Sequence, residues 1–332
     1  MTAATSRRCG RVVDPGFRLQ CRHTRFRNVA LPARFFRNLQ GLVTFTACTV
    51  NTIVWFVPII VFGLLKLVLP VGGARSILTS WIMLFGTAWV GCNSFIFSVG
   101  NTTTWDVRGL ESLRPDRWYL VFANHQTWVD IVALQTVFNR RIPFLMFFIK
   151  QELVWFPFLG LAWWAMDMPF MKRYSKSYIA THPEEKGKDL EATRRACTKF
   201  RDAPTTVINF VEGTRFTEEK RANRGSPYRY LLTPRAGGVA LALSTMGEMF
   251  NAILDVTIVY PGRTPAFWDM MCGDFRHVVI DIRQRPVDAW LYEGDYESDR
   301  EFRKRFHQWL SDLWAEKDRR IGEELEAGGT GA

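Results

Sequence analysis

Two long uncharged segments constrain the fold of this chain more than any other feature. Residues 41–65 and residues 76–100 each run for 25 positions without a charged side chain. As helices, at about 1.5 Å per residue, each would reach roughly 37 Å, which exceeds the ~30 Å of hydrocarbon in a bilayer. Lys66, Pro70 and Arg75 lie in the short turn between them. The sequence therefore predicts a helical hairpin in a membrane.

Two other arrangements of these segments stay open at this stage. They could be buried core helices of a soluble protein, although uncharged runs of this length are unusual there. They could also insert only part of the way, because Asn51, Pro58 and Asn93 are more easily accommodated at a shallow depth. If both helices cross, the tail before them and the chain after residue 100 share the cytoplasmic side. We expect the membrane to be a bacterial cell inner membrane.

Most of the positive charge precedes the first apolar segment. The formal net charge is +11, and residues 1–40 hold nine Arg and one Asp, with no Lys or Glu. Such a tail is typical of the cytoplasmic flank of a membrane segment and is attracted to anionic lipid. An organelle transit peptide is a second interpretation. A nucleic-acid-binding arm is a third, but no reader module follows it, so we expect membrane lipids and no nucleic acid among the partners.

The six cysteines are scattered along the chain and include no CxxC pair. This spacing supports neither a disulfide framework nor a zinc site. We expect free thiols in a reducing compartment.

After residue 100, short apolar runs alternate with charged helical stretches, which predicts an α/β domain with a largely buried sheet flanked by helices. We predict strands at 118–123, 205–211, 252–260 and 277–283, and helices at 127–139, 184–202, 235–250 and 299–323. The last helix carries one apolar stripe, which we expect to pack on the domain. The predicted organisation is a basic tail (1–40), a membrane hairpin (41–100), an α/β catalytic domain (101–295), and an amphipathic helix with a disordered end from residue 327 (296–332).

A candidate catalytic pair follows the strand predicted at 118–123. That strand ends at Asn124 and His125, and Asp130 follows. On a regular helix a His and an Asp five positions apart point about 140° away from each other. They can meet only if His125 lies in the turn and Asp130 in the first helical turns, with Thr127 as a possible cap. Asp130 would then hold one imidazole nitrogen and leave the other free to take a proton, although a histidine satisfied at a strand end is the alternative.

A second strand end carries the segment FVEGTR, residues 210–215. Gly213 allows the backbone to turn closely there. Arg215 is suited to bidentate recognition of a phosphate. Glu212 is better interpreted as orienting Arg215 or a substrate hydroxyl than as a phosphate contact. The alternative is a turn with a surface salt bridge.

Four blocks in this order resemble the signature blocks of the glycerolipid acyltransferases that make phosphatidic acid and remodel lysophospholipids. They are NHQTWVD at 124–130, KQELVWFPFLG followed by MPFMKR within 150–173, FVEGTR at 210–215, and DVTIVYPG at 255–262. The segment LLTPRAGG at 231–238 resembles the branch that contains bacterial inner-membrane lysophosphatidic acid acyltransferases and animal lysocardiolipin acyltransferases. The resemblance covers about residues 40–285. It departs at Val211, where many relatives have proline.

The resemblance implies an acyl transfer without an acyl-enzyme, a metal or a cofactor. His125 would take the proton from the sn-2 hydroxyl of a lysophospholipid, and that oxygen would attack the thioester of acyl-CoA or of an acyl-carrier protein. Asp130 would orient the imidazole. Arg215 and Arg173, with Lys172, would hold the acceptor phosphate. The predicted catalytic residues are His125 and Asp130, and the predicted substrate-binding residues are Asn124, Lys172, Arg173, Glu212, Gly213, Thr214 and Arg215.

Three questions stay open on the sequence alone. The aromatic run around Trp155, Phe156, Trp163 and Trp164 could face the bilayer, line an acyl groove or pack in the core. The chain could be a non-enzymatic membrane anchor whose basic tail recruits lipid or a protein. It could also acylate a different acceptor, such as glycerol 3-phosphate or a lipopolysaccharide precursor.

Overall fold

The computed structural model describes residues 30–69, 72–101, 103–156, 158–171 and 203–329, together with residues 181, 197 and 200. Most of the basic tail and most of the helix predicted at 184–202 lie outside the described residues.

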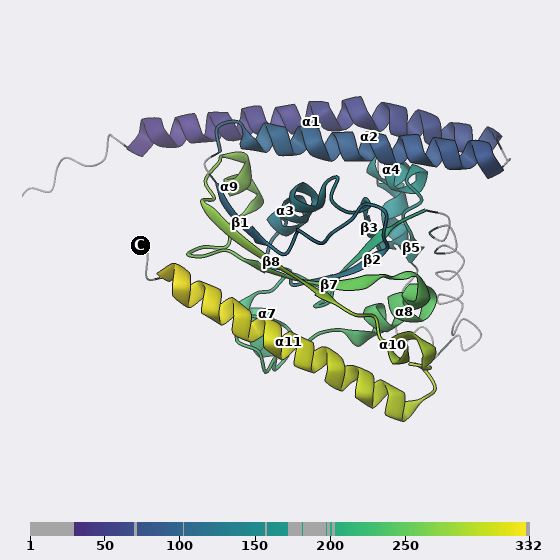
Figure 1. Ribbon diagram of the computed structural model, residues 1–332. Helices are drawn as coiled ribbons and strands as arrows, with labels where there is room; N and C mark the ends of the chain where they lie inside the picture. Colours follow the sequence, from purple (N-terminus) through teal and green to yellow (C-terminus); the bar gives the residue numbers. More distant parts are fainter. Residues whose placement is uncertain are drawn as a thin grey trace, which may run out of the picture.

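The two uncharged segments form helices α1 (Ala30–Val68) and α2 (Gly72–Ser98), which lie side by side (Figure 1). The parts Arg34–Val68 and Gly73–Ser98 are long and apolar enough to cross a membrane. The two apolar helices of the predicted hairpin are therefore confirmed, with α1 beginning at Ala30, inside the predicted tail. Their insertion in a membrane stays a prediction. The amide of Asn51 donates to Asn93 Oδ1 at 2.9 Å and to the Trp89 carbonyl at 3.1 Å. These polar groups satisfy each other between the helices.

The domain after residue 100 alternates strands and helices, as predicted from the alternation of short apolar runs with charged stretches in the sequence. In chain order its elements are β1 (Thr104–Arg108), β2 (Tyr119–Ala123), α3 (Val129–Phe138), β3 (Leu145–Phe147), β4 (Ile149–Lys150), the 3-10 helix η1 (Gln151–Trp155), α4 (Leu159–Ala165), β5 (Phe170–Met171), β6 (Thr206–Phe210), α7 (Glu218–Asn223), α8 (Ala236–Met246), the 3-10 helix η4 (Gly247–Met249), β7 (Ala252–Val259), α9 (Phe267–Met271), β8 (His277–Arg285), α10 (Trp290–Glu293) and α11 (Arg300–Gly329).

Six of these strands form one mixed sheet in the order β1-β8-β7-β2-β6-β3, which confirms the predicted α/β class. The four strands that we predicted are β2, β6, β7 and β8, which carry long apolar runs. We missed β1 and β3 at the two edges. Strand β1 has exposed and half-buried residues and shows no buried apolar run, while β3 is apolar and mostly buried but has only three residues.

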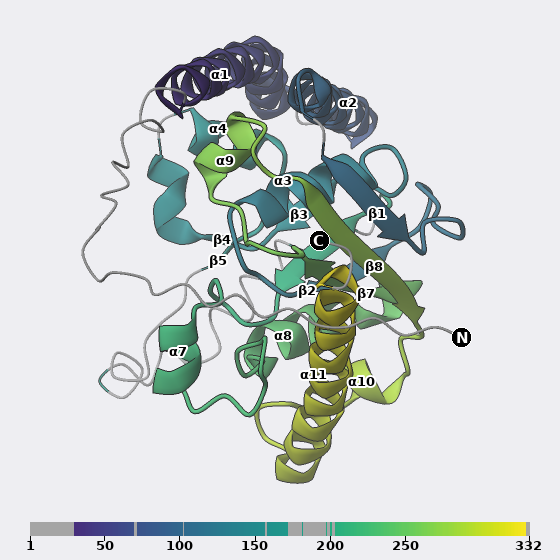
Figure 2. The same cartoon turned by 90° about the vertical axis from the view of Figure 1, so that its left-hand side faces the viewer.

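The core lies on both faces of the sheet (Figures 1 and 2). Along β2, Tyr119 and Val121 face the cluster that contains α3 and α9, while Leu120 and Phe122 face the cluster that contains α8 and α11. This alternation is the two-residue period of a strand covered on both sides. Strand β2 runs parallel to both β6 and β7, so the loops that follow these three strands meet at one edge of the sheet.

The hairpin packs along the domain rather than projecting from it (Figure 1). Near one end of α1, Arg37 pairs with Asp274 at 2.7 Å. Near the other end, a Cβ added to Gly63 would lie 2.4 Å from the Cβ of Ala165 in α4, so only glycine permits this approach. Lys66 donates to the Ala165 carbonyl at 3.2 Å. Both ends of α1 are therefore fixed against the domain surface.

Helix α11 carries the apolar stripe predicted for residues 299–323. Phe306 and Trp314 are fully buried against the sheet, so the stripe packs on the domain, as expected. The helix continues to Gly329, whereas we predicted a disordered end from residue 327; residues 330–332 lie outside the described part. Its polar side also enters the core, because Lys317 and Arg320 are buried and pair with Asp255 of β7.

Candidate active site

His125 and Asp130 meet at the carboxyl edge of the sheet, in the arrangement that their spacing requires. His125 lies in the turn after β2, and Asp130 lies in the first turn of α3. Nδ1 of His125 is 2.9 Å from Oδ2 of Asp130. Among the described residues, nothing hydrogen-bonds Nε2 of the imidazole. This nitrogen is available to accept a proton.

The carboxylate of Asp130 is fully buried and is held by several donors. The backbone N–H groups of Gln126 and Thr127 donate to Oδ2 at 2.6 and 2.9 Å. The hydroxyl of Tyr260 donates to Oδ1 at 2.8 Å. These contacts fix the carboxylate and, through it, the imidazole. The Tyr260 pKa is raised well above its ordinary value by burial and by the nearby Asp130 charge, so its hydroxyl keeps its proton.

The turn between His125 and α3 differs in one detail from our prediction. Thr127 accepts only a long hydrogen bond of 3.4 Å from Val129 N, and its hydroxyl donates to the Pro265 carbonyl at 2.7 Å. The side chain of Asp130 instead accepts the free N–H groups of this turn. The residue that orients the imidazole therefore also stabilises the turn that leads into the helix.

Phe210, the last residue of β6, stacks on the imidazole. The two ring centroids are 4.1 Å apart and the planes differ by 20°. Phe147 of β3 stacks in turn on Phe210 at 6.5 Å. One face of His125 is thus covered by an aromatic side chain, which limits rotation of the ring and excludes water from that side.

Glu212 has a different role from the predicted substrate contact. Its carboxylate is fully buried and accepts the backbone N–H of His125 at 2.9 Å and that of Leu232 at 2.8 Å. It makes no ion pair with Arg215. Burial raises the Glu212 pKa to about 7, although the two N–H groups act in the opposite direction. Glu212 therefore fixes the turn that carries His125, and these contacts do not support direct binding of substrate.

Asn124 is also a positioning residue in the structure. Its buried amide donates to the Ile258 carbonyl at 2.9 Å and accepts the Ile258 N–H at 2.8 Å. The pair locks the end of β2 to β7. Because both ends of the amide are occupied, the predicted substrate contact of Asn124 is not supported either.

The remaining predicted residues of the second strand end form an open turn beside His125. Gly213 adopts φ +68°, a conformation that glycine accommodates without strain. The Phe216 N–H donates to the His125 carbonyl at 2.7 Å, which draws the turn over the histidine. Arg215 is exposed, and its guanidinium lies 4.9 Å from the ring centroid of Trp128. Thr214 accepts a hydrogen bond from Lys220 Nζ at 3.1 Å.

Lys172 and Arg173 lie outside the described residues, and their predicted phosphate contacts stay predictions. The aromatic run that precedes them divides into two groups. Trp155 is 86% exposed and Phe156 is 52% exposed. Trp163 and Trp164 are half-buried against the core. Within the described part of the chain, no three His, Cys, Asp or Glu side chains are grouped as ligands for a metal ion.

Sequence reasoning assigned no role to Tyr260 or Phe210. Tyr260 precedes Pro261 in the fourth block, but an aromatic residue there gave no sign of a contact with Asp130. Phe210 was included as a strand residue and as the first residue of the block at 210–215, but no role was assigned to it. Their roles depend on the pairing of β2 with β6 and β7, which brings distant segments together.

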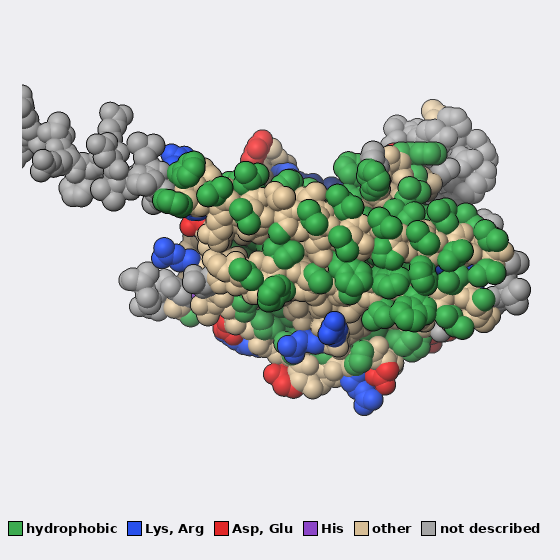
Figure 3. Space-filling model, turned by 90° about the horizontal axis from the view of Figure 1, so that it is seen from above, with side chains coloured by type: hydrophobic (Ala, Val, Ile, Leu, Met, Phe, Trp, Pro, Cys, Tyr) green, Lys and Arg blue, Asp and Glu red, His purple; other side chains and the backbone are tan. Residues whose placement is uncertain are grey.

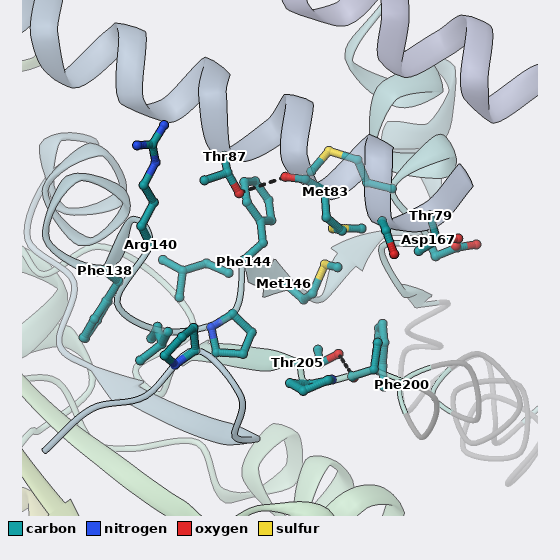
Figure 4. Close-up of a pocket in the computed structure, with 18 of the residues that line it drawn as sticks. Thr79, Met83, Thr87, Phe138, Arg140, Phe144, Met146, Asp167, Phe200 and Thr205 are labelled. Carbon is teal, nitrogen blue, oxygen red and sulfur yellow. Dashed lines mark hydrogen bonds between the residues drawn. The ribbon is translucent and has the colours of Figure 1, made fainter. Parts of the chain in front are cut away.

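A cavity of about 580 Å³ lies beneath α2, as Figure 4 shows. Leu145 and Thr205 line it, so it lies at the amino-terminal ends of β3 and β6. His125 follows the opposite end of β2, roughly 16 Å away for five residues of strand. The inner lining is mostly apolar, while Arg75 and Arg140 add positive charge and Asp167 adds negative charge. Other lining residues are Met83, Thr87, Phe138, Phe144, Met146 and Met166.

The His–Asp pair and the glycine turn lie in a part of the chain that matches a known family. Residues 104–261 match the family model described as Acyltransferase. Residues 104–261 of this chain, just under half of its length, are therefore similar to this acyltransferase family.

Particular relatives agree with the class. The chain is 26% identical to 1-acyl-sn-glycerol-3-phosphate acyltransferase gamma of Homo sapiens over 212 residues, covering 60% of this chain and 51% of that protein. It is 27% identical to 1-acyl-sn-glycerol-3-phosphate acyltransferase 3 of Arabidopsis thaliana over 217 residues, covering 61% and 52%. The chain thus spans about half the length of the curated relatives it matches.

One solved structure is also similar to this chain. It is the 1-acyl-sn-glycerophosphate (LPA) acyltransferase PlsC of Thermotoga maritima, with 18% identity and a TM-score of 0.43. The match covers 84% of this chain and 98% of that one.

Proposed function

We propose that this protein is a membrane-bound enzyme of phospholipid biosynthesis or remodelling. It transfers a fatty acyl group from acyl-CoA, or from an acyl-carrier protein, to the sn-2 hydroxyl of lysophosphatidic acid or another lysophospholipid. The single observation that carries this proposal is the His125–Asp130 pair, because it leaves one imidazole nitrogen free beside an open turn with an exposed arginine. The names of the relatives add support.

The reaction follows from the geometry of the pair. His125 Nε2 takes the proton of the acceptor hydroxyl as its oxygen attacks the thioester carbonyl. The new C–O bond forms, the C–S bond breaks, and the thiolate leaves with the proton that the imidazolium returns. Asp130 stabilises the imidazolium, and Tyr260 and Glu212 keep the partners in place. No cofactor enters this proposal, since the acyl donor is a co-substrate.

The acceptor phosphate would bind at the turn after β6. Gly213 allows close approach of the backbone, Thr214 offers a hydroxyl, and Arg215 offers a guanidinium. Lys172 and Arg173 are proposed to complete this binding from the preceding block.

We propose that the hairpin lies along the membrane instead of crossing it. Because α1 is fixed to the domain at both ends, a perpendicular crossing would draw the charged domain into hydrocarbon. The face formed by α1 and α2 is broad and mostly apolar (Figure 3). Its exposed residues include Phe36, Leu42, Val54, Val57, Ile77 and Leu84, with Trp155 of η1 and Trp268 of α9 beside them. We place this face in the cytoplasmic leaflet of a cell inner membrane.

Acyl transfer by purified, detergent-solubilised protein tests the function. Wild type and His125→Ala would be compared with oleoyl-CoA or acyl-carrier protein as donor and a panel of lysophospholipids as acceptors. We expect product from the wild type and a loss of about 10²–10⁴-fold in His125→Ala, the usual range for a general base. His307→Ala is the matched control, because His307 also precedes an aspartate, Asp312, by five positions but is exposed on α11. Full activity of folded His125→Ala would refute the assignment, and no product with any pair would favour the non-enzymatic anchor.

A further inference from the structure

Three cationic side chains surround the turn at Gly213–Arg215. Arg215 stacks over Trp128 on one side of the turn. Lys220 of α7 donates to Thr214 Oγ1 at 3.1 Å and to the Arg215 carbonyl at 3.0 Å. Arg235, from the segment before α8, lies against Gly213. Only the first of these was identified from the sequence.

The position of Arg235 is set by the backbone of the same turn. Its N–H donates to the Val211 carbonyl at 2.8 Å, at the end of β6. A Cβ added to Gly213 would lie 2.9 Å from Arg235 Cδ and 3.4 Å from Nε. The side chain therefore runs along the glycine, and a larger residue at position 213 would displace it. The absence of a side chain at Gly213 makes room for the arginine.

The three cations are not neutralised by neighbouring acids. Among the described residues, no carboxylate forms an ion pair with Arg215, Lys220 or Arg235. Glu212 belongs to the same turn but faces inward, toward the N–H groups of His125 and Leu232. Three positive charges held around one turn favour an anion with more than one negative charge.

We propose that Arg235 binds the acceptor phosphate together with Arg215 and Lys220, and that this cluster selects acceptors with a phosphomonoester. This inference rests on the proposed function. A phosphomonoester carries up to two negative charges near neutral pH, as a phosphorylated side chain does, whereas the phosphodiester of other lysophospholipids carries one. The extra arginine therefore favours lysophosphatidic acid over lysophospholipids whose phosphate bears a further head group.

The chemistry of the two substrates indicates the acceptor rather than the donor as the ligand. In lysophosphatidic acid, the carbon that bears the phosphate is bonded to the carbon that bears the reacting hydroxyl. The phosphate must therefore lie close to His125, whose carbonyl accepts the Phe216 N–H of the same turn. The phosphates of the donor lie at the far end of its pantetheine arm, away from the reacting carbonyl.

The test compares Arg235→Gln and Arg235→Lys with wild type in detergent. Arg221→Gln is the control, because Arg221 is a neighbouring arginine, next to Lys220 on α7, that pairs with Glu218 at 2.8 Å. KM and kcat are measured for lysophosphatidic acid and lysophosphatidylglycerol, and KM for oleoyl-CoA. Inhibition by inorganic phosphate reports on the anion site without a lipid tail. The thermal midpoint of each variant checks folding.

We expect Arg235→Gln to lower kcat/KM for lysophosphatidic acid by about 10- to 100-fold, mainly through KM, the range for one charged hydrogen bond. The loss of kcat/KM with lysophosphatidylglycerol should be smaller, and inhibition by inorganic phosphate should weaken. The KM for oleoyl-CoA should stay unchanged. The Arg235→Lys variant should recover part of the lost kcat/KM. An unchanged KM for lysophosphatidic acid, an equal loss with both acceptors, or a change confined to the donor overturns the inference. These results would leave the proposed function standing if His125→Ala is inactive. Wild type without any transferase activity overturns both.

Discussion

Replacement of Glu212 by Gln tests how burial controls the turn that carries His125. The variant keeps the shape of the side chain and one acceptor oxygen, but it never carries the negative charge. In the wild type, burial raises the Glu212 pKa from 4.5 to about 7, against two backbone N–H groups at 2.8 and 2.9 Å. The folded protein therefore holds this proton more tightly than the unfolded chain does.

The sign of the pH dependence follows from that difference. The contribution of Glu212 to stability is fully present below pH 4.5 and is lost as the pH rises through about 7. At about 1.36 kcal/mol per pH unit, the shift corresponds to about 3 kcal/mol. For a domain of this size, 1 kcal/mol moves the thermal midpoint by about 2–4 °C. The wild type should lose about 6 °C or more between pH 4.5 and pH 8 relative to Glu212→Gln.

Thermal unfolding of the detergent-solubilised proteins, followed by intrinsic tryptophan fluorescence at several pH values, measures this difference. All other titrating groups are common to both proteins. Subtracting the thermal midpoint of one protein from that of the other at each pH therefore isolates the contribution of Glu212. If the thermal midpoints of wild type and Glu212→Gln change in parallel with pH, the carboxylate is not desolvated in the folded protein. The reasoning would then be wrong. Acyl transfer by the variant should also fall, because Gln can accept only one of the two N–H groups with its single carbonyl oxygen.

Two further substitutions probe buried contacts behind the site. Tyr260→Phe removes the hydroxyl that donates to Asp130, so kcat should fall about tenfold with little change in KM, measured by steady-state kinetics over a range of pH. Asp255→Asn leaves Lys317 and Arg320 buried without their carboxylate, so the free energy of unfolding should fall by about 3–5 kcal/mol, measured by denaturant titration.

Each of these has its own control. If a drop in the thermal midpoint of Tyr260→Phe accounts for its lost activity, Tyr260 contributes to stability and does not position Asp130. For the charge cluster, Glu323→Gln breaks the exposed pair of Glu323 with Arg319 and should cost less than about 1 kcal/mol. Equal costs for Asp255→Asn and Glu323→Gln would contradict the importance of burial.

Much of the fold could be predicted because its signals are local. The runs at β2, β6, β7 and β8 are apolar and rich in strand formers. The two helices of the hairpin can be recognised from the length of their uncharged segments alone. The edge strand β1 carries no such run because it is partly exposed, and β3 is apolar but too short to be recognised as a separate strand. The pair His125 and Asp130 was also a local prediction, since a strand end followed by a helix start leaves few arrangements for five residues.

By itself, the sequence determined the four apolar strands, the uncharged hairpin and the His–Asp pair, because these depend on residues within one or two turns of each other. Only the tertiary structure decided that Tyr260 reaches Asp130, that Glu212 faces inward, and that Arg235 lies along Gly213. Parallel pairing of β2 with β6 and β7 joins segments far apart in sequence. Whether a polar side chain there is buried and held, or free to bind a substrate, depends on partners that no local pattern specifies.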